Sequence, residues 1–208
     1  MWPLPHNAFE LVLVLLLSSW PRLRYALESD EQALHKLTKT SMHPEQYADR
    51  KWWRAQLREQ GAHWLVLERA GDRELVGVVG HVTRGEMYGL PIRGHVPLLA
   101  VHPSCRRRGY GQFLLRSALL QLHASFDCVS LYVRPDNDAA LRLYRRCGFE
   151  QHVVVPGYYA DGANAILCVR WRALGRSSNA ITEDESELSR KRISRTVREL
   201  VYDSADTV

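Results

Sequence analysis

The chain has 208 residues, of which 46% are hydrophobic, and it carries a formal net charge of +5. This length and composition allow one packed domain with appendages and exclude a chain that is disordered throughout. The positive charge suits a polyanionic ligand, although charge concerns association rather than mechanism. The four cysteines form neither a C-x-x-C pair nor a His/Cys cluster with zinc spacing, so we expect no metal site and reduced thiols in an intracellular setting.

An apolar extension, residues 1–21, precedes the predicted domain and contains the continuous run Leu11–Leu17. This run is too short to span a bilayer, which needs roughly 20 apolar residues. No Lys or Arg precedes the run and no small-residue cleavage site follows it, unlike a secretory signal peptide. We therefore predict a packed appendage helix, with membrane contact by residues 9–20 as the alternative.

Apolar periodicity and turn residues predict the remaining elements in chain order. We expect Asp30 to cap the first helix and Ala70-Gly71-Asp72 to close a hairpin. The expected helices are 31–39, 47–59, 112–122 and 138–147, and the expected strands are 23–26, 64–68, 74–83, 96–101, 129–133, 151–155 and 165–171. This order predicts an α/β domain, residues 22–174, in which helices cover a mixed sheet. The charged segment 175–208 is expected to be a disordered tail, with nuclear targeting by its basic triplet as the alternative.

The segment Val101–Gln112 is the most informative about function, because three arginines and two glycines join a predicted strand to a predicted helix. Glycine lets the backbone turn sharply and approach a ligand closely. The free N–H groups and the dipole of a helix N-terminus attract an anion, and Arg106, Arg107 and Arg108 can add charge-assisted hydrogen bonds. The spacing fits neither a Walker A loop nor G-x-G-x-x-G. We expect a diphosphate site of another kind here, the alternative being a basic loop before an ordinary helix.

Two motifs resemble those of the GCN5-related N-acetyltransferases (GNAT). Arg106-x-x-Gly109-x-Gly111 resembles the acetyl-CoA loop of that family, and Val133–Phe149 resembles its pattern V-x-x-x-N-x-x-A-x-x-L-Y-x-x-x-G-F. The resemblance implies the GNAT fold, a central mixed sheet whose fourth and fifth strands splay, and acetyl-CoA as cosubstrate without a metal. Pro97 fits such a splay because it cannot donate to a sheet ladder.

The resemblance also implies a set of cofactor-binding residues. In the family, the residue at Asn137 contacts the cofactor arm, and the hydroxyl at Tyr144 protonates the departing thiolate. The alternatives are a helix cap for Asn137 and a core aromatic for Tyr144. The full implied set is Leu99, Ala100, Val101, Arg106, Arg107, Arg108, Gly109, Tyr110, Gly111, Gln112, Asn137 and Tyr144.

Four further segments resemble the catalytic subunit of NatA-type N-terminal acetyltransferases, within a similarity that spans about residues 22–172. These segments are Pro44-Glu-Gln-Tyr47, Gly94–Val101, Ser130–Arg134 and Tyr158-Tyr-Ala-Asp-Gly162. The resemblance implies catalytic roles for Glu45, His95, Arg134 and Tyr144. It implies contacts with the substrate peptide from Pro44, Glu45, Tyr47, Tyr158 and Tyr159.

Five of these residues also have a purely structural interpretation. Glu45 could be an acid in the first turn of a helix, and Arg134 a partner in a surface ion pair. Tyr158 and Tyr159 could pack a loop, and His95 could be a hydrogen-bonded strand histidine.

The expected reaction is direct transfer of acetyl from acetyl-CoA to the α-amino group of protein N-termini. An α-amine has a pKa of about 7.7–8.0 and lysine one of about 10.4, so a mild base such as Glu45 or His95 suffices for the former. The alternatives are a GNAT enzyme for lysine or a small amine, or a catalytically silent CoA-binding module. Expected partners are protein or peptide N-termini and a candidate ribosome-anchoring auxiliary subunit, in the cytoplasm. No direct nucleic acid binding is expected, because no aromatic residues interleave with the arginines.

The sequence also departs from the NatA-type pattern. Tyr132 stands where the pattern has His, and Pro97-Leu98 stand where it has Thr-Ser. Gly162-Ala163-Asn164 replace an acidic Gly-Glu-Asp. The last change makes the expected peptide mouth less negative, so the substrate preference is expected to differ.

Overall fold

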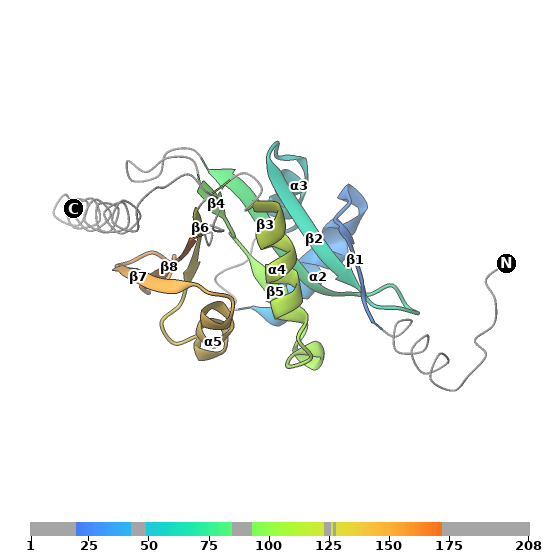
Figure 1. The fold of residues 1–208 in the computed structure, drawn as a ribbon. Coiled ribbons are helices and arrows are strands. Elements are labelled where there is room, and N and C mark those ends of the chain that lie inside the picture. The colour runs from blue at the N-terminus through green and yellow to red at the C-terminus, as the bar shows by residue number, and fades with distance from the viewer. Residues whose placement is uncertain (1–19, 43–48, 85–92, 123–125, 127, 172–208) are drawn as a thin grey trace, which may run out of the picture. The chain divides into compact units, whose positions relative to one another are not determined.

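The computed structural model describes residues 20–42, 49–84, 93–122, 126 and 128–171 (Figure 1). Within these ranges, no helix is long and apolar enough to cross a membrane. The elements in chain order, with η for a 3-10 helix, are β1 (Arg22–Tyr25), η1 (Glu28–Asp30), α2 (Glu31–Ser41), α3 (Arg50–Arg58), β2 (Ala62–Glu68), β3 (Leu75–Arg84), β4 (Arg93–His95), β5 (Leu99–Val101), η3 (Pro103–Cys105), α4 (Tyr110–Leu122), β6 (Cys128–Val133), α5 (Asp138–Arg146), β7 (Glu150–Val155) and β8 (Ala165–Trp171).

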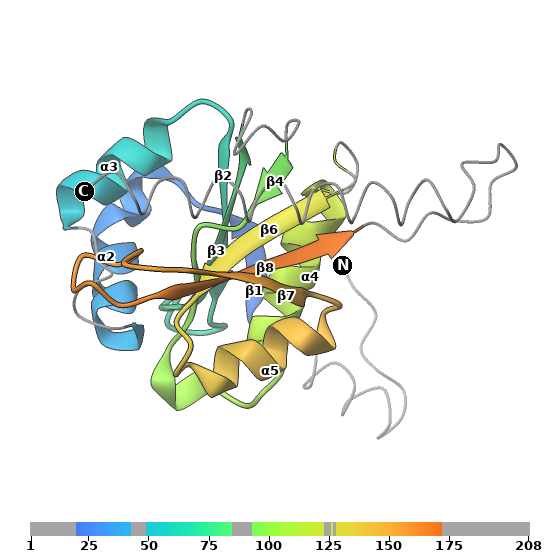
Figure 2. The same cartoon turned by 90° about the vertical axis from the view of Figure 1, so that its left-hand side faces the viewer.

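The described strands form one eight-stranded sheet in the order β1-β2-β3-β4-β6-β8-β7, with β5 paired to β3 beside that path. β4 and β6 run parallel. The β1–β2, β3–β4, β3–β5, β6–β8 and β7–β8 pairs are antiparallel. This mixed sheet, whose strands are labelled in Figure 1 and seen from another side in Figure 2, confirms the predicted α/β fold class.

Two compact units divide the chain, and each is described by itself below. Unit 1 comprises Met1–Gly80 and Leu98–Leu114, and unit 2 comprises His81–Pro97 and Leu115–Val208. Strand β3 and helix α4 each contribute residues to both units.

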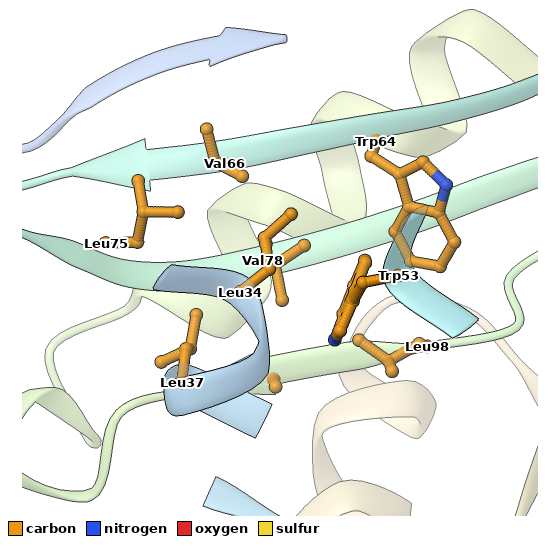
Figure 3. Packing of buried hydrophobic residues seen from close by; sticks show 9 residues of the cluster. Leu34, Leu37, Trp53, Trp64, Val66, Leu75, Val78 and Leu98 are labelled. Atoms are coloured by element: carbon orange, nitrogen blue, oxygen red, sulfur yellow. The ribbon is translucent and has the colours of Figure 1, made fainter. Parts of the chain in front are cut away.

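Tryptophan packing dominates the core of unit 1. Trp53 of α3 is fully buried, and its ring centroid lies 4.8 Å from that of Trp64 of β2 in an edge-to-face arrangement. Leu34 and Leu98 belong to the same cluster, and Figure 3 shows the indole of Trp53 beside Leu98. The indole N–H of Trp53 donates to Thr38 Oγ1 at 3.2 Å, so its one polar atom is satisfied. Truncating such a side chain to Ala typically costs about 3–5 kcal/mol.

Two predictions about helix starts in unit 1 are wrong. Asp30 stands at the N-cap position of α2, but its carboxylate makes no cap hydrogen bond there. Instead it accepts from the Leu27 N–H at 2.7 Å and from Arg24 at 2.7 and 2.9 Å. The backbone of Asp30 is helical, with φ −80° and ψ −5°, rather than extended as at a typical N-cap. The second helix begins at Arg50 rather than at position 47, since Asp49 is extended and accepts the Trp52 N–H at 2.9 Å as an N-cap.

The continuous strand predicted over residues 96–101 is also wrong. The structure has two short strands here, β4 and β5, and neither contains Pro97. Proline lacks the N–H that a ladder requires, so the strand is interrupted. The β4–β6 register ends at His95 and Ser130, the Val96 N–H donates to Ser130 O at 2.9 Å, and β5 pairs with β3. The chain therefore pairs with β6 before Pro97 and no longer does so in β5, as expected if the predicted strands 96–101 and 129–133 separate at the proline.

Strand β6 has two chemically different faces in unit 2. Val129, Leu131 and Val133 alternate along it and are buried in the apolar core. Successive side chains of a strand point to opposite faces, so Ser130 and Tyr132 share the other face, which continues to Arg134 just beyond the strand. The helix that follows, α5, ends before Gly148, whose φ of 82° confirms the predicted glycine stop.

Candidate active site

The arginine–glycine loop of unit 1 has the backbone of an anion site. Gly109 has a φ of 84°, a conformation that strains other residues, and Arg107 shares the left-handed region with a φ of 59°. The Phe113 N–H donates to Gly109 O at 3.0 Å. The N–H groups of Tyr110, Gly111 and Gln112 precede this bond, so they lack intrahelical acceptors and are available to an anion.

The three arginines of this loop are exposed but differ in their partners. Arg106 donates to Val101 O at 3.3 Å and to Ser41 O at 2.5 Å, so part of its guanidinium is held by main-chain carbonyls. Within the described ranges, Arg107 and Arg108 have no ion pair or side-chain hydrogen bond. Two of the three predicted phosphate ligands therefore have guanidinium groups ready for a ligand, and the donor set fits a diphosphate.

The three residues of β5 that are predicted to bind the cofactor differ in the direction of their backbone N–H groups. The Gly80 N–H donates to Leu98 O, and the His102 N–H donates to Val76 O, both at 2.9 Å. Because antiparallel strands alternate the direction of their amides, Ala100, paired with Val78, also faces β3. The N–H groups of Leu99 and Val101 therefore point to the other edge of β5. These two amides, rather than that of Ala100, are oriented to donate to a bound carbonyl.

In unit 2, the polar face of β6 gathers aromatic and basic side chains. Ser130 Oγ lies 3.1 Å from His95 Nδ1, and both residues are almost fully buried. The ring of Tyr132 is tilted against His95, with centroids 5.7 Å apart, and stacks on Tyr158 at 4.3 Å with an interplanar angle of 24°. These contacts connect a buried imidazole to an exposed tyrosine, which is 43% accessible.

Arg134 continues this face and contacts the loop between β7 and β8. Its Nη1 lies 2.8 Å from Asp161 Oδ2, and its guanidinium carbon lies 4.2 Å above the centroid of the Tyr159 ring. Tyr159 in turn meets Tyr158 edge to face at 5.0 Å. The alternative interpretation of Arg134 as a partner in a surface ion pair is therefore half right. The ion pair exists, but Arg134 is only 9% exposed and is thus buried.

Tyr144 lies on α5 of unit 2, and Asn137 immediately precedes that helix. Burial raises the pKa of the Tyr144 hydroxyl, and the neighbouring Cys168 and Tyr159 raise it further when they ionise, so this hydroxyl holds its proton at physiological pH. Asn137 is the N-cap of α5, since its Oδ1 accepts the Ala140 N–H at 3.1 Å. The cap uses the carbonyl oxygen and leaves the Nδ2 donors for another partner.

Some predicted site residues lie outside the described residues, namely Pro44, Glu45 and Tyr47. Sequence reasoning did not assign Asp161, Ser130 or Tyr132 to the site. The sequence did contain information on them. Asp161 belongs to the segment Y-Y-A-D-G, and Ser130 and Tyr132 lie four and two residues before Arg134, as expected for side chains on one face of a strand.

All four cysteines are free and buried. Burial raises the pKa of the Cys168 thiol to about 11. Burial also raises the pKa of the Cys147 thiol, against the opposing effect of Arg116 and Arg170. Neither thiol is therefore activated as a nucleophile. The described residues contain no group of His, Cys, Asp and Glu that could hold a metal ion.

The mixed sheet interrupted at Pro97 and the arginine–glycine loop at the start of α4 define an α/β protein with an anion site of the kind that the GNAT resemblance implies. The chain belongs to the acetyltransferase (GNAT) family, whose model matches residues 21–149. It is 30% identical over 154 residues to an N-alpha-acetyltransferase of Sulfurisphaera tokodaii, covering 70% of this chain and 90% of that protein. These findings make it an N-acetyltransferase of the GNAT type.

Two further comparisons confirm the resemblance to NatA-type catalytic subunits. The chain is 33% identical over 142 residues to an N-terminal acetyltransferase complex ARD1 subunit homolog of Dictyostelium discoideum, covering 66% of this chain and 68% of that one. The crystal structure of Ard1 from Thermoplasma volcanium matches with a TM-score of 0.62 and 26% identity, covering 73% of this chain and 97% of that chain.

Proposed function

We propose that this protein transfers acetyl from acetyl-CoA to the α-amino group of protein N-termini. The observation that carries the proposal is the aromatic and basic face of β6, on which Tyr132 and Tyr158 stack beside the buried His95. Tyrosine faces attract an ammonium group, and a neutral imidazole can take its proton. The N-alpha-acetyltransferase names of the archaeal relatives support the same acceptor.

Acetyl-CoA supplies the activated acetyl thioester, and the residues of unit 1 bind and polarise it. Arg107, Arg108 and the first amides of α4 hold the diphosphate. The N–H groups of Leu99 and Val101 donate to the thioester carbonyl and stabilise the negative charge that develops on its oxygen. No residue forms a covalent bond to the acetyl group, in keeping with the raised thiol pKa values of Cys147 and Cys168.

A second set of residues handles the acceptor amine, its protons and the leaving thiolate. His95 or Glu45 accepts a proton from the α-ammonium group, which a mild base can do because the pKa of that group is about 8. Tyr144 donates its proton to the departing thiolate as the C–S bond breaks, and the raised pKa keeps that proton available. The second proton, which the nitrogen loses as the amide forms, restores the Tyr144 hydroxyl. Tyr158 and Tyr159 cover the N-terminal residue of the peptide. Protein N-termini are then the partners, with a cytoplasmic location and an auxiliary ribosome-anchoring subunit as further proposals.

The test uses the purified full chain, acetyl-CoA and a matched pair of peptides. Both peptides contain one internal lysine, and one has a free N-terminus whereas the other is formylated. We expect acetylation of the free α-amine, located by fragment masses, and turnover of the formylated peptide at least about tenfold slower. Equal turnover of the two peptides, with acetyl on lysine, would overturn the proposal in favour of a lysine acetyltransferase.

A further inference from the structure

We propose that Asp161 is a positioning residue, which acts through Arg134 to hold the acceptor-binding tyrosines in place. The segment concerned is the aromatic loop, defined here as residues 156–164 between β7 and β8. The inference rests on the proposed function, because it assigns the loop to the acceptor amine. It adds a residue with no role in the chemistry itself and explains why Arg134 is buried.

The aromatic loop is built on its own hydrogen bonds, and Asp161 is central to them. The Tyr159 N–H donates to Ala163 O at 3.0 Å, and the Gly162 N–H donates to Tyr159 O at 2.8 Å. Asp161 Oδ1 accepts the Ala163 N–H at 3.1 Å. Its other oxygen, Oδ2, pairs with Arg134 Nη1 at 2.8 Å. One carboxylate therefore organises the turn with one oxygen and fastens it to β6 with the other.

Arg134 suits the other side of this connection better than lysine would. Its guanidinium is planar and presents several donors, so one edge can pair with Asp161 while the flat face lies over Tyr159. The Arg134 side chain is 10% exposed and that of Asp161 is 23% exposed. Water screens such a pair less than it screens a surface pair, so the loss of either partner should be felt by the loop.

A second contact holds the aromatic loop independently of Asp161. Tyr132 lies two residues before Arg134 and therefore projects from the same face of β6. It stacks on Tyr158 with 4.3 Å between ring centroids. The ion pair thus fixes Tyr159, and the stack fixes Tyr158. Removing Asp161 should loosen one tyrosine and leave the other in contact with β6.

The test compares Asp161→Asn, Asp161→Glu and Arg134→Lys with wild type and with Glu150→Gln, a matched control that changes an exposed carboxylate of β7 in the same unit. We expect Asp161→Asn to raise the peptide KM about tenfold, the range expected for a lost charge-assisted hydrogen bond. The acetyl-CoA Kd should change less than about twofold, because the contacts of Asp161 described above are with Arg134 and with its own loop. Asp161→Glu should recover part of the loss, and Glu150→Gln should behave as wild type.

Chymotryptic cleavage after Tyr158 and Tyr159 in the native chain is a readout that needs no activity. We expect cleavage after Tyr159 to be about tenfold faster in Asp161→Asn and Arg134→Lys than in wild type and Glu150→Gln, because this part of the loop opens more often. If Asp161→Asn fails to fold, the glutamate and lysine variants carry the same comparison.

The inference is overturned if the Asp161 variants match Glu150→Gln in peptide KM and cleavage rate. It is also overturned if acetyl-CoA Kd and peptide KM rise together, since that marks a general structural role. Faster cleavage in a chain whose wild type acetylates no free N-terminus would overturn the proposed function while leaving the role of Asp161 in the loop intact.

Discussion

The arginine–glycine loop of unit 1 and the polar face of β6 in unit 2 both use arginine, in opposite ways. Arg107 and Arg108 are exposed and hold no ion pair within the described ranges. Arg134 is 9% exposed, pairs with Asp161 and covers Tyr159. An arginine that binds a soluble anion must stay accessible, whereas one that shapes a loop is desolvated and paired. Burial and partners, rather than residue type, therefore distinguish binding from positioning.

The largest effect is expected from Tyr144→Phe, which tests whether acid catalysis can be separated from donor binding. The variant loses the proton donor but keeps the ring, so kcat should fall about a hundredfold or more, while the acetyl-CoA Kd stays within about twofold. Steady-state kinetics and calorimetric titration give the two values. A parallel loss of kcat and affinity would contradict the acid role.

The pH profile checks the same hydroxyl. Because burial raises the pKa of Tyr144, the wild-type kcat should show no alkaline decline from this group below about pH 10, the usual pKa of tyrosine. A decline near pH 8 that disappears in Tyr144→Phe would mean that the hydroxyl ionises easily.

A smaller effect is expected from the exposed arginines of the loop. Arg107→Ala and Arg108→Ala should each weaken acetyl-CoA binding about tenfold, with little change in thermal stability. The loss should shrink as salt is added, because exposed charges are screened. Arg106→Ala, in contrast, should also lower the melting temperature, since Arg106 donates to Val101 O and Ser41 O. Equal stability losses in all three variants would remove the distinction.

The pairing of Asp30 with Arg24 predicts a modest dependence of stability on pH. Burial raises the pKa of the Asp30 carboxyl, but hydrogen bonds from Arg24 and the Leu27 N–H outweigh it and lower the pKa below its usual value. The folded state then binds fewer protons than the unfolded state, so this stabilisation is present above about pH 4 and is lost as pH falls further. Asp30→Asn should be less stable at pH 7 and lose less stability on acidification. Denaturant unfolding at pH 7 and pH 3, with Glu150→Gln as control, measures both.

The smallest effect is expected from Cys168→Ala. Its thiol, with a pKa of about 11, is almost entirely protonated at pH 8, so it cannot relay the acetyl group. Turnover should remain within about twofold of wild type. Intact mass after incubation with acetyl-CoA alone should show no acetylated chain, and a persistent acetyl adduct on cysteine would contradict direct transfer.

Local patterns in the sequence predicted most of the fold, and the elements that were predicted wrongly have identifiable physical causes. Strand 165–171 and the glycine stop at Gly148 follow from residue periodicity and backbone preference. The sequence showed that Pro97 cannot donate a hydrogen bond to a neighbouring strand. The apolar residues around it nevertheless favoured a single continuous strand. Asp30 was misassigned because its partner Arg24 lies on β1, and propensity does not reveal which donor a carboxylate will choose.

The candidate site was predictable in its residue types but not in its pairings. The motifs identified Arg134, Tyr158 and Tyr159, whereas the ion pair with Asp161 joins positions 27 residues apart across β6 and the aromatic loop. Tyr132 was noted as a departure from the family pattern, and its stacking on Tyr158 became evident only from the geometry. Local periodicity predicts faces of elements, and tertiary structure decides which faces meet.

The most direct test is to measure acetyl-CoA binding and peptide binding in the same two variants, because the account assigns the two functions to separate sets of residues. Acetyl-CoA Kd and peptide KM are measured for Arg108→Ala and Asp161→Asn in the full chain. We expect Arg108→Ala to raise Kd about tenfold and leave KM nearly unchanged, and Asp161→Asn to do the reverse. If either variant changes both constants equally, the two sets of residues do not act separately and the account is contradicted.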